Sequence, residues 1–251
     1  SSSHALIGGL CGSALAASGN NLNALIWSEP ADPIYQSKGL LWKVVVPMVT
    51  SPVGGFLLGL LIMGILFAVI SKMSQAGGML SRIARPKVMN KVFGRLQIVS
   101  AAGMGFMHGT NDAQKTMGII TVLLYSTGRL TGEFAVPHWV AISCYIAIAL
   151  GTLSGGWKII ETMGSRITKL SHHQAFSASS AGSIVLFTAS WLGIPVSTTH
   201  TITGSIIGAG AARRASAVRW GIAGNVITAW FITLPASAAV GALFYYLTLL
   251  F

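Results

Sequence analysis

The peptide PVSTTHTITGSIIG occupies positions 195–208, and a near copy, SSSHALIGGLCG, occupies positions 1–12. In both copies a run of hydroxyl residues ends in histidine, and these histidines, His4 and His200, are 196 positions apart. Glycines recur at the same offset, Gly8 with Gly204 and Gly12 with Gly208. A polar peptide that appears twice in an apolar chain indicates an internal repeat.

The composition is that of a membrane protein. Of 251 residues, 53% are hydrophobic and only 8% are charged, whereas a soluble domain carries about 25% charged residues. The 16 Lys and Arg against 5 Asp and Glu fall between apolar segments and are not interleaved with stacking aromatics. This placement excludes nucleic-acid binding and fits the positive-inside rule. Cys11 and Cys144 lie in apolar runs and are expected to be packing residues, not a disulfide or metal site.

Loop charges predict the orientation of the chain. Long apolar stretches run at 40–71, 96–126, 138–154 and 218–250, and a helix needs about 20 residues to cross a bilayer. The segments expected to be cytoplasmic, because they are rich in Lys and Arg, are 72–95, 155–174 and 211–219. The segments expected to be external are 17–37 and 127–137.

Residues 175–210 must leave the cytoplasmic side and return to it, with two arms too short to span separately. They therefore predict a re-entrant hairpin with its polar tip at GIPVSTTH. The first copy leads from its tip to the external side, opposite to the second, which is typical of an inverted-topology repeat. The expected fold is an all-α polytopic membrane protein with discontinuous helices and re-entrant hairpins. Its predicted parts are the remainder of a first repeat at 1–71, a basic linker at 72–95 and a second repeat at 96–251.

A second polar cluster lies in the stretch GFMHGTNDAQKTMGII, positions 105–120. Charges at membrane depth are costly and usually mark an ion or substrate path. Residues 109–112 resemble a helix break followed by an N-cap, so we expect a discontinuous helix that exposes a carboxylate suited to Na⁺ or H⁺. The alternative is a purely structural pairing of Asp112 with Lys115 or His108. The polar residues of the stretch are His108, Asn111, Asp112, Gln114 and Lys115.

The two hydroxyl-rich tips suit an anion. Ser and Thr are good N-caps, and a helix N-terminus presents free N–H donors with partial positive charge. Two such tips from opposite sides are able to hold one tetrahedral oxyanion between them; alternatively, they are ordinary caps of buried helices. The tip residues are Ser1, Ser2, Ser3, Ser197, Thr198 and Thr199. His4 and His200 either hold the tips in place or relay protons, and the sequence leaves both open.

The motifs HGTNDAQKTMG (108–118) and PVSTTH (195–200), together with SSSHALIGG, resemble the PiT family of inorganic phosphate transporters over essentially the whole chain. The resemblance implies phosphate symport driven by Na⁺ or H⁺ in a bacterial-type inner (plasma) membrane, with no cofactor and no enzymatic activity, and a homodimer is plausible from it. By the resemblance, Asn111 and Asp112 fall on the coupling-ion and phosphate motif, and the hydroxyl residues of the tips fall on the phosphate contacts. We place Gln114 with the coupling-ion residues and His4, His108, Lys115 and His200 as supporting residues.

Several alternatives accompany this reading. Relatives implied by the resemblance carry sulfate or a metal–phosphate complex, while a passive anion channel and a membrane-embedded hydrolase are alternatives from other classes. The hydrolase is disfavoured because the apolar segments hold neither a second carboxylate nor a His/Glu metal cluster. The family has two ND motifs, whereas this chain has one, and the repeat offset would place the other before Ser1. We therefore expect the sequence to be a fragment that begins inside its first hairpin.

Overall fold

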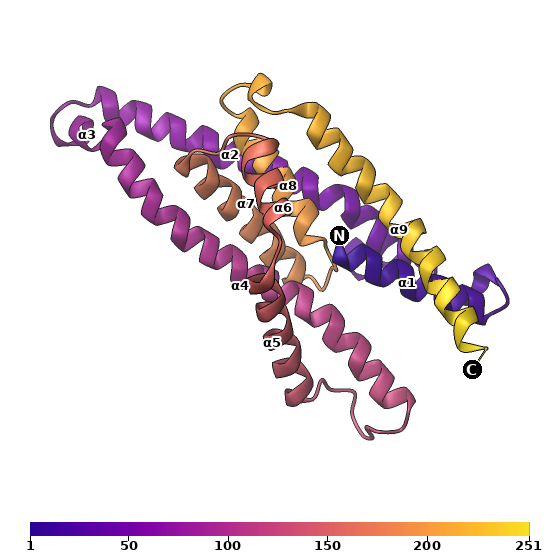
Figure 1. Cartoon of the computed structure of the whole chain (residues 1–251). Coiled ribbons are helices and arrows are strands. Elements are labelled where there is room, and N and C mark those ends of the chain that lie inside the picture. The colour runs from indigo at the N-terminus through magenta and orange to yellow at the C-terminus, as the bar shows by residue number, and fades with distance from the viewer. Residues whose placement is uncertain (251) are drawn as a thin grey trace.

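The fold is built from helices, as a computed structural model covering residues 1–250 shows (Figure 1). Within those residues the only β-pairing is an isolated bridge between Glu29 and Lys38. The longer helices are α1 (Ser2–Ala17), α2 (Val46–Gln75), α4 (Pro86–Ser126), α5 (His138–Ser154), α7 (His172–Trp191), α8 (Thr198–Ala211) and α9 (Trp220–Thr248). The shorter ones are α3 (Gly78–Ile83), α6 (Trp157–Glu161), 3-10 turns at Leu22–Ala24, Ile34–Gln36 and Ala215–Ala217, and π-helical turns at Leu41–Val45 and Thr162–Arg166.

Two helical stretches are long and apolar enough to cross a membrane. One is Leu41–Gln75, which joins the π-helical turn to α2, and the other is α9, Trp220–Thr248. A third candidate is the pair His138–Ser154 and Trp157–Arg166, which is bent by 67°. The bend falls at Gly155–Gly156, where Gly156 adopts the left-handed region with φ +102° that favours glycine. The all-α membrane fold expected from the sequence is therefore confirmed.

The helix break predicted at residues 109–112 is wrong, because α4 runs without interruption over 41 residues. The Thr110 hydroxyl does not cap a new helix but donates back to the carbonyl oxygens of Phe106 at 3.0 Å and Met107 at 3.1 Å. Asp112 pairs with Lys115 one turn later, at 2.9 Å. The cap-like residues are thus satisfied inside a continuous helix.

The basic segment 72–95, which the sequence predicts to be a linker, is mostly helical. Helix α2 continues to Gln75, α3 follows at Gly78–Ile83, and α4 begins at Pro86. Arg85 is extended at the N-cap and Pro86 takes the first helical position, where its missing N–H costs nothing. Lys and Arg are good helix formers, so high charge here does not prevent helix formation.

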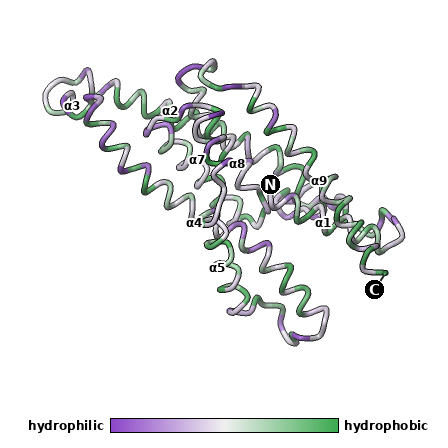
Figure 2. The backbone as a smooth tube through the Cα atoms, viewed as in Figure 1, coloured by the Kyte–Doolittle hydropathy of each residue, from purple (hydrophilic) through white to green (hydrophobic). Residues whose placement is uncertain are grey.

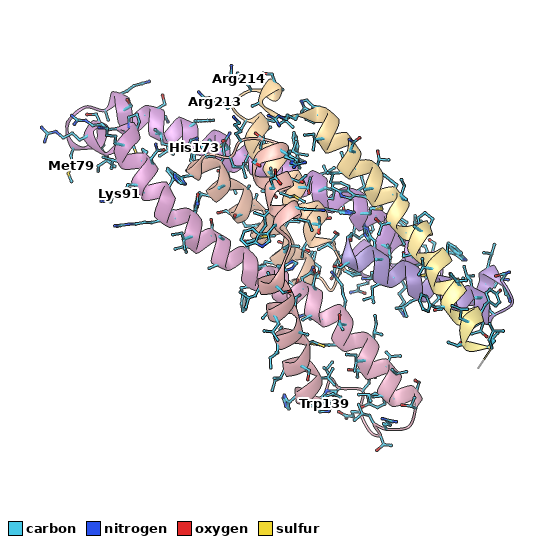
Figure 3. All side chains as sticks on the ribbon, in the orientation of Figure 1. Met79, Lys91, Trp139, His173, Arg213 and Arg214 are labelled. Carbon is cyan, nitrogen blue, oxygen red and sulfur yellow. The ribbon has the colours of Figure 1, made fainter. Side chains whose placement is uncertain are left out.

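Polar residues are concentrated in several of the segments that connect the long helices (Figure 2). Hydrophilic residues gather around α3 and in the loop before α9, whereas α2 and α9 are mostly hydrophobic (Figure 2). Figure 3 places Lys91, Arg213 and Arg214 on the upper side of the view and Trp139 near the opposite end. The three basic residues, from two segments predicted to be cytoplasmic, thus lie on one side of the molecule (Figure 3), as the positive-inside rule requires, while the sidedness itself stays a prediction.

Helices α7 and α8 form the two arms of the predicted hairpin, with residues 192–197 between them as the tip. Ser171 opens α7 with a capping box, in which its hydroxyl and Gln174 satisfy each other's backbone N–H groups. Gly193, with φ +62°, lets the chain turn at the end of α7. The hairpin is therefore present, while its entry into a bilayer stays a prediction.

Each helix of the two repeated peptides packs along the long helix of the other predicted repeat. Helix α1 lies against α9, and α8 lies against α2. The matched glycines make these close approaches possible: a Cβ on Gly12 would overlap the backbone of Ala238, and one on Gly208 would overlap the backbone of Phe56. Helices α1 and α8 both begin in the middle of the molecule and lead toward opposite ends of it (Figure 1).

Candidate substrate and cation site

The two hydroxyl-rich peptides open their helices in the same way. The Ser1 hydroxyl accepts a hydrogen bond from the His4 backbone N–H at 3.2 Å, and the Ser197 hydroxyl accepts one from the His200 N–H at 3.3 Å. Each serine thus satisfies one of the free N–H groups of the first helical turn. The others in that turn remain available to an anion.

The two helix N-termini meet. The imidazole rings of His4 and His200 are 4.7 Å apart in an edge-to-face arrangement. His200 is fully buried and stacks on the Trp230 indole of α9, with ring centroids 4.0 Å apart. The matched histidines therefore lie at the contact between the two tips, which favours a role in holding the tips together.

Helix α4 passes beside this contact and brings its polar residues to it. Asn111 is buried, and its amide donates to the Val196 carbonyl oxygen in the hairpin tip at 3.2 Å. The Asp112 carboxylate accepts a hydrogen bond from the Thr198 hydroxyl at 3.1 Å. The predicted cation motif and the predicted anion tip are thus direct neighbours.

Lys115 connects all three parts of the site. Its Nζ lies 2.9 Å from the Asp112 carboxylate, 2.7 Å from the Ser3 hydroxyl and 2.6 Å from the Val196 carbonyl oxygen. His108 is a looser neighbour, with its Nδ1 3.6 Å from the other Asp112 oxygen. The pairing of Asp112 with Lys115, one of the two structural alternatives considered above, is therefore present.

Two cavities of the site share His108 in their lining. One, of about 510 Å³, is lined by Ser2, His108 and Asp112 together with residues of α5. Another, of about 390 Å³, is lined by His108, Thr198, Thr199 and the glycines of the α5–α6 bend. His108 therefore lies between the two cavities. The first reaches the α1 tip at Ser2, and the second reaches the hairpin tip at Thr198 and Thr199.

Gln114 lies apart from this arrangement. Its side chain is exposed and lines a smaller cavity of about 290 Å³ with Asn111, Lys115 and Pro195. It is the one predicted ion residue that the described residues do not bring to Asp112.

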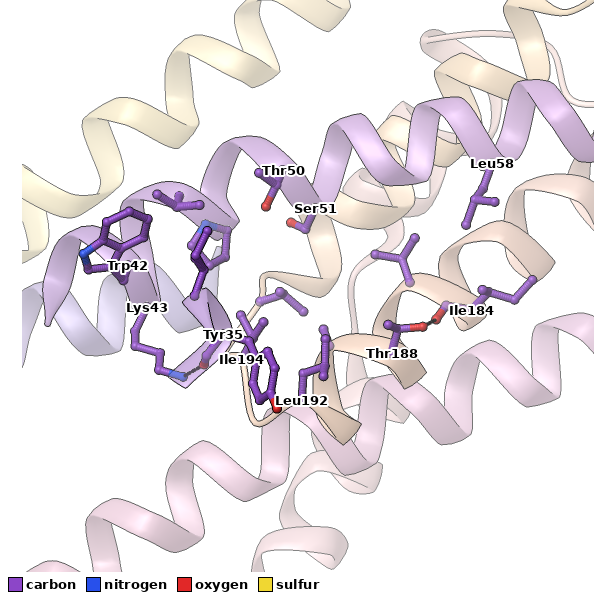
Figure 4. Close-up of a pocket in the computed structure, with 16 residues that line it drawn as sticks. Tyr35, Trp42, Lys43, Thr50, Ser51, Leu58, Ile184, Thr188, Leu192 and Ile194 are labelled. Carbon is purple, nitrogen blue, oxygen red and sulfur yellow. Dashed lines mark hydrogen bonds between the residues drawn. The ribbon is translucent and has the colours of Figure 1, made fainter. Parts of the chain in front are cut away.

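A separate apolar cavity of about 500 Å³ lies between α2 and α7 (Figure 4). Lys43 is the positively charged residue in the lining of this cavity, and its Nζ donates to the Tyr35 carbonyl oxygen at 2.8 Å. This cavity meets the site only through Val196 and has no carboxylate in its lining. It therefore lacks the chemistry for a coupled ion site.

Two members of the site were missed from the sequence. The Val196 carbonyl lies in the quoted tip, and its non-helical position was the available signal, because tip carbonyls have no helical partner. Trp230 carries no such signal, since it is one of several aromatics in an apolar stretch. Only the packing of α9 along α1 brings Trp230 to His200.

The apolar helices and the polar cluster between them define an integral membrane protein, and comparison with known proteins shows its family. The chain belongs to the phosphate transporter family, whose model matches residues 1–241. It is 52% identical over 246 residues to a probable low-affinity inorganic phosphate transporter of Rhizobium meliloti (strain 1021), covering 98% of this chain and 66% of that protein. It is 40% identical over 247 residues to one of Bacillus subtilis (strain 168), covering 98% and 67%. The chain therefore spans about two thirds of the length of these relatives.

A solved structure titled "The sodium-dependent phosphate transporter" shares the fold, with a TM-score of 0.74 and 24% identity. The match covers 100% of this chain and 74% of that one. The family expected from the two motifs is therefore confirmed.

Proposed function

We propose that the chain forms part of a secondary active transporter that carries inorganic phosphate together with a cation, Na⁺ or H⁺, by alternating access. The relatives named above are described as inorganic phosphate transporters, and the fold neighbour as sodium-dependent. The observation that carries the proposal is the meeting of two helix N-termini beside Asp112.

Phosphate binds at the two tips in this proposal. The free N–H groups of the first turns of α1 and α8, with the hydroxyls of the tip residues, offer donors to a tetrahedral anion without a fixed arginine. An anion held by dipoles and hydroxyls is also able to leave, which a transporter needs. The residues assigned to this role are Ser1, Ser2, Ser3, Ser197, Thr198 and Thr199.

The cation binds at the carboxylate side of the same site. Asp112 is the acceptor, Asn111 holds the hairpin tip against it through Val196, and Gln114 stands at the neighbouring cavity. His4, His108, Lys115 and His200 support the arrangement. Anion and cation favour each other here, because opposite charges attract strongly where water is excluded.

Helix α1 packs on α9, and α8 packs on α2. This exchange of packing partners supports an inverted repeat, with residues 1–71 and 96–251 as its two parts. Rocking of one part against the other would expose the cavities beside His108 in turn. In this proposal the protein lies in the plasma membrane, as a monomer or a homodimer, with 72–95, 155–174 and 211–219 in the cytoplasm.

Uptake of radiolabelled phosphate into proteoliposomes holding the intact protein tests this function. Na⁺ and pH gradients are imposed separately, and sulfate and divalent metals serve as competitors. Asp112→Asn should abolish gradient-driven accumulation, because the amide has no charge to offset a cation, whereas Asp32→Asn in an exposed loop should leave it unchanged. Normal accumulation by Asp112→Asn would contradict the coupling role, and uptake that ignores both gradients would indicate a passive channel.

A further inference from the structure

The surroundings of the Lys115 ammonium are unusual for a lysine. Its three contacts come from three separate parts of the chain, namely Asp112 on α4, Ser3 at the α1 tip and Val196 at the hairpin tip. The side chain is 13% exposed, and its carboxylate partner is 10% exposed. A mobile surface lysine has no such fixed set of partners.

The donor set is that of a site for a hard cation. The carboxylate, the hydroxyl and the backbone carbonyl of the non-helical tip all supply oxygen atoms, and transporters coordinate Na⁺ with oxygens of these kinds at broken helices. The ammonium has three N–H donors and no acceptor. Three oxygens at 2.6–2.9 Å therefore use its full hydrogen-bonding capacity.

The oxygens also need a positive charge at this place. A carboxylate that is only 10% exposed is costly unless it is paired, and the Val196 carbonyl and the Ser3 hydroxyl add the negative ends of two further dipoles. Without the ammonium, the three oxygens would face one another around an unbalanced charge. Either a lysine or a cation from solution would remove this cost.

We propose that the Lys115 ammonium is a tethered cation, which fills a monovalent-cation site formed by Asp112, Ser3 and Val196 and makes that site independent of Na⁺. The inference rests on the proposed function, since it specifies which charge balances Asp112 while phosphate is bound. Removal of the ammonium should convert the same oxygens into a Na⁺ site. Lys115 is thus a specificity-determining residue for the coupling ion.

Thermal unfolding of the purified intact protein, in NaCl against choline chloride, tests cation binding without any phosphate uptake. The native protein should melt at the same temperature in both salts. Lys115→Ala should melt lower in choline and should recover about 3–6 °C at a Na⁺ concentration tenfold above its dissociation constant. Lys43→Ala, which removes a lysine bonded to a single carbonyl, should show no response to Na⁺.

A double variant locates the ion. Asp112→Asn combined with Lys115→Ala removes both charges, so the response to Na⁺ should disappear. If Lys115→Ala does not fold in choline, Lys115→Asn keeps a polar side chain and should show the same gain of Na⁺ sensitivity. A Lys115→Ala or Lys115→Asn protein indifferent to Na⁺ would overturn the inference, as would a native protein stabilised by Na⁺ as strongly as the variant.

Phosphate uptake separates this inference from the proposed function. If a pH gradient drives phosphate uptake by the native protein equally in NaCl and in choline chloride, and Lys115→Ala transports only in NaCl, both proposals are supported. The other outcome is that neither the native protein nor Lys115→Ala transports phosphate, while the melting temperatures respond to Na⁺ as expected. In that case the proposed function fails and the tethered cation stands.

Discussion

The packing of α2 on α8 offers a direct test of the fold, through Gly59→Ala. Gly59 is buried at this contact, where a Cβ would lie 2.5 Å from the Ser205 carbonyl oxygen and 3.1 Å from the Ala209 nitrogen. Both atoms belong to the backbone of α8 and cannot rotate away. Gly64, on the same helix, would place its Cβ in open space, so Gly64→Ala is the matched control.

The expected magnitude follows from this geometry. Because Cβ contacts closer than 3.0 Å are essentially never observed, the two helices must separate by several tenths of an ångström along their length. Overpacking of this kind costs about 1–3 kcal/mol. Alanine is also a better helix former than glycine by about 1 kcal/mol, but both variants gain that amount, so their difference isolates the steric cost.

Thermal unfolding in detergent measures the difference. For a chain of this size, 1 kcal/mol shifts the melting temperature by about 2–4 °C, so Gly59→Ala should melt about 2–12 °C below Gly64→Ala. Equal melting temperatures would refute the close approach of α2 and α8, and with it the position of the α8 tip beside α4.

Other predictions concern the matching contact, the tip and the basic end. Gly241→Ala, whose Cβ would overlap the Gly9 backbone, should destabilise the protein as Gly59→Ala does, relative to the unobstructed Gly224→Ala; equal melting of these two would contradict the packing of α1 on α9. Thr198→Ala combined with Thr199→Ala should raise the apparent KM for phosphate by about 10- to 150-fold in the uptake assay, because a hydrogen bond to a charged group contributes about 1.5–3 kcal/mol, and an unchanged KM would remove the tip from the site. Burial, reinforced by the charges of Arg213 and His172, lowers the pKa of His173, so the unfolded chain takes up this proton first and stability should fall as the pH drops below about 6.5. His173→Phe, which keeps a ring against Phe67 and Phe93, should weaken that pH dependence of the melting temperature.

Local signals in the sequence were sufficient for the tips. Proline and serine at 195–197 mark the end of one helix and the start of the next, and the same chemistry at Ser1 predicts the first tip. The matched glycines predict close helix packing, and the structure places each of them against backbone. These features depend on residues adjacent in sequence or on a regular offset.

The same kind of signal failed at the ND motif. Glycine, threonine, asparagine and aspartate in succession resemble a helix start, but each polar group finds a partner that lets α4 continue, such as the Phe106 carbonyl for Thr110. The partners of Lys115 were out of reach for a different reason. Ser3 lies 112 positions away and Val196 lies 81 positions away, and no local pattern encodes which distant oxygens a lysine will meet.

The packing of α1 on α9 also constrains the order in which parts of the protein fold during synthesis. About 200 residues separate the end of α1 from the start of α9, and synthesis at about 5–20 residues per second makes α1 wait about 10–40 s for its partner. During that interval the glycine face of α1 lacks α9, the helix that covers it. The residues of α1 therefore reach their final packing only after α9 is made, so a ribosome that stalls before α9 would leave the glycine face of α1 available to membrane chaperones and proteases.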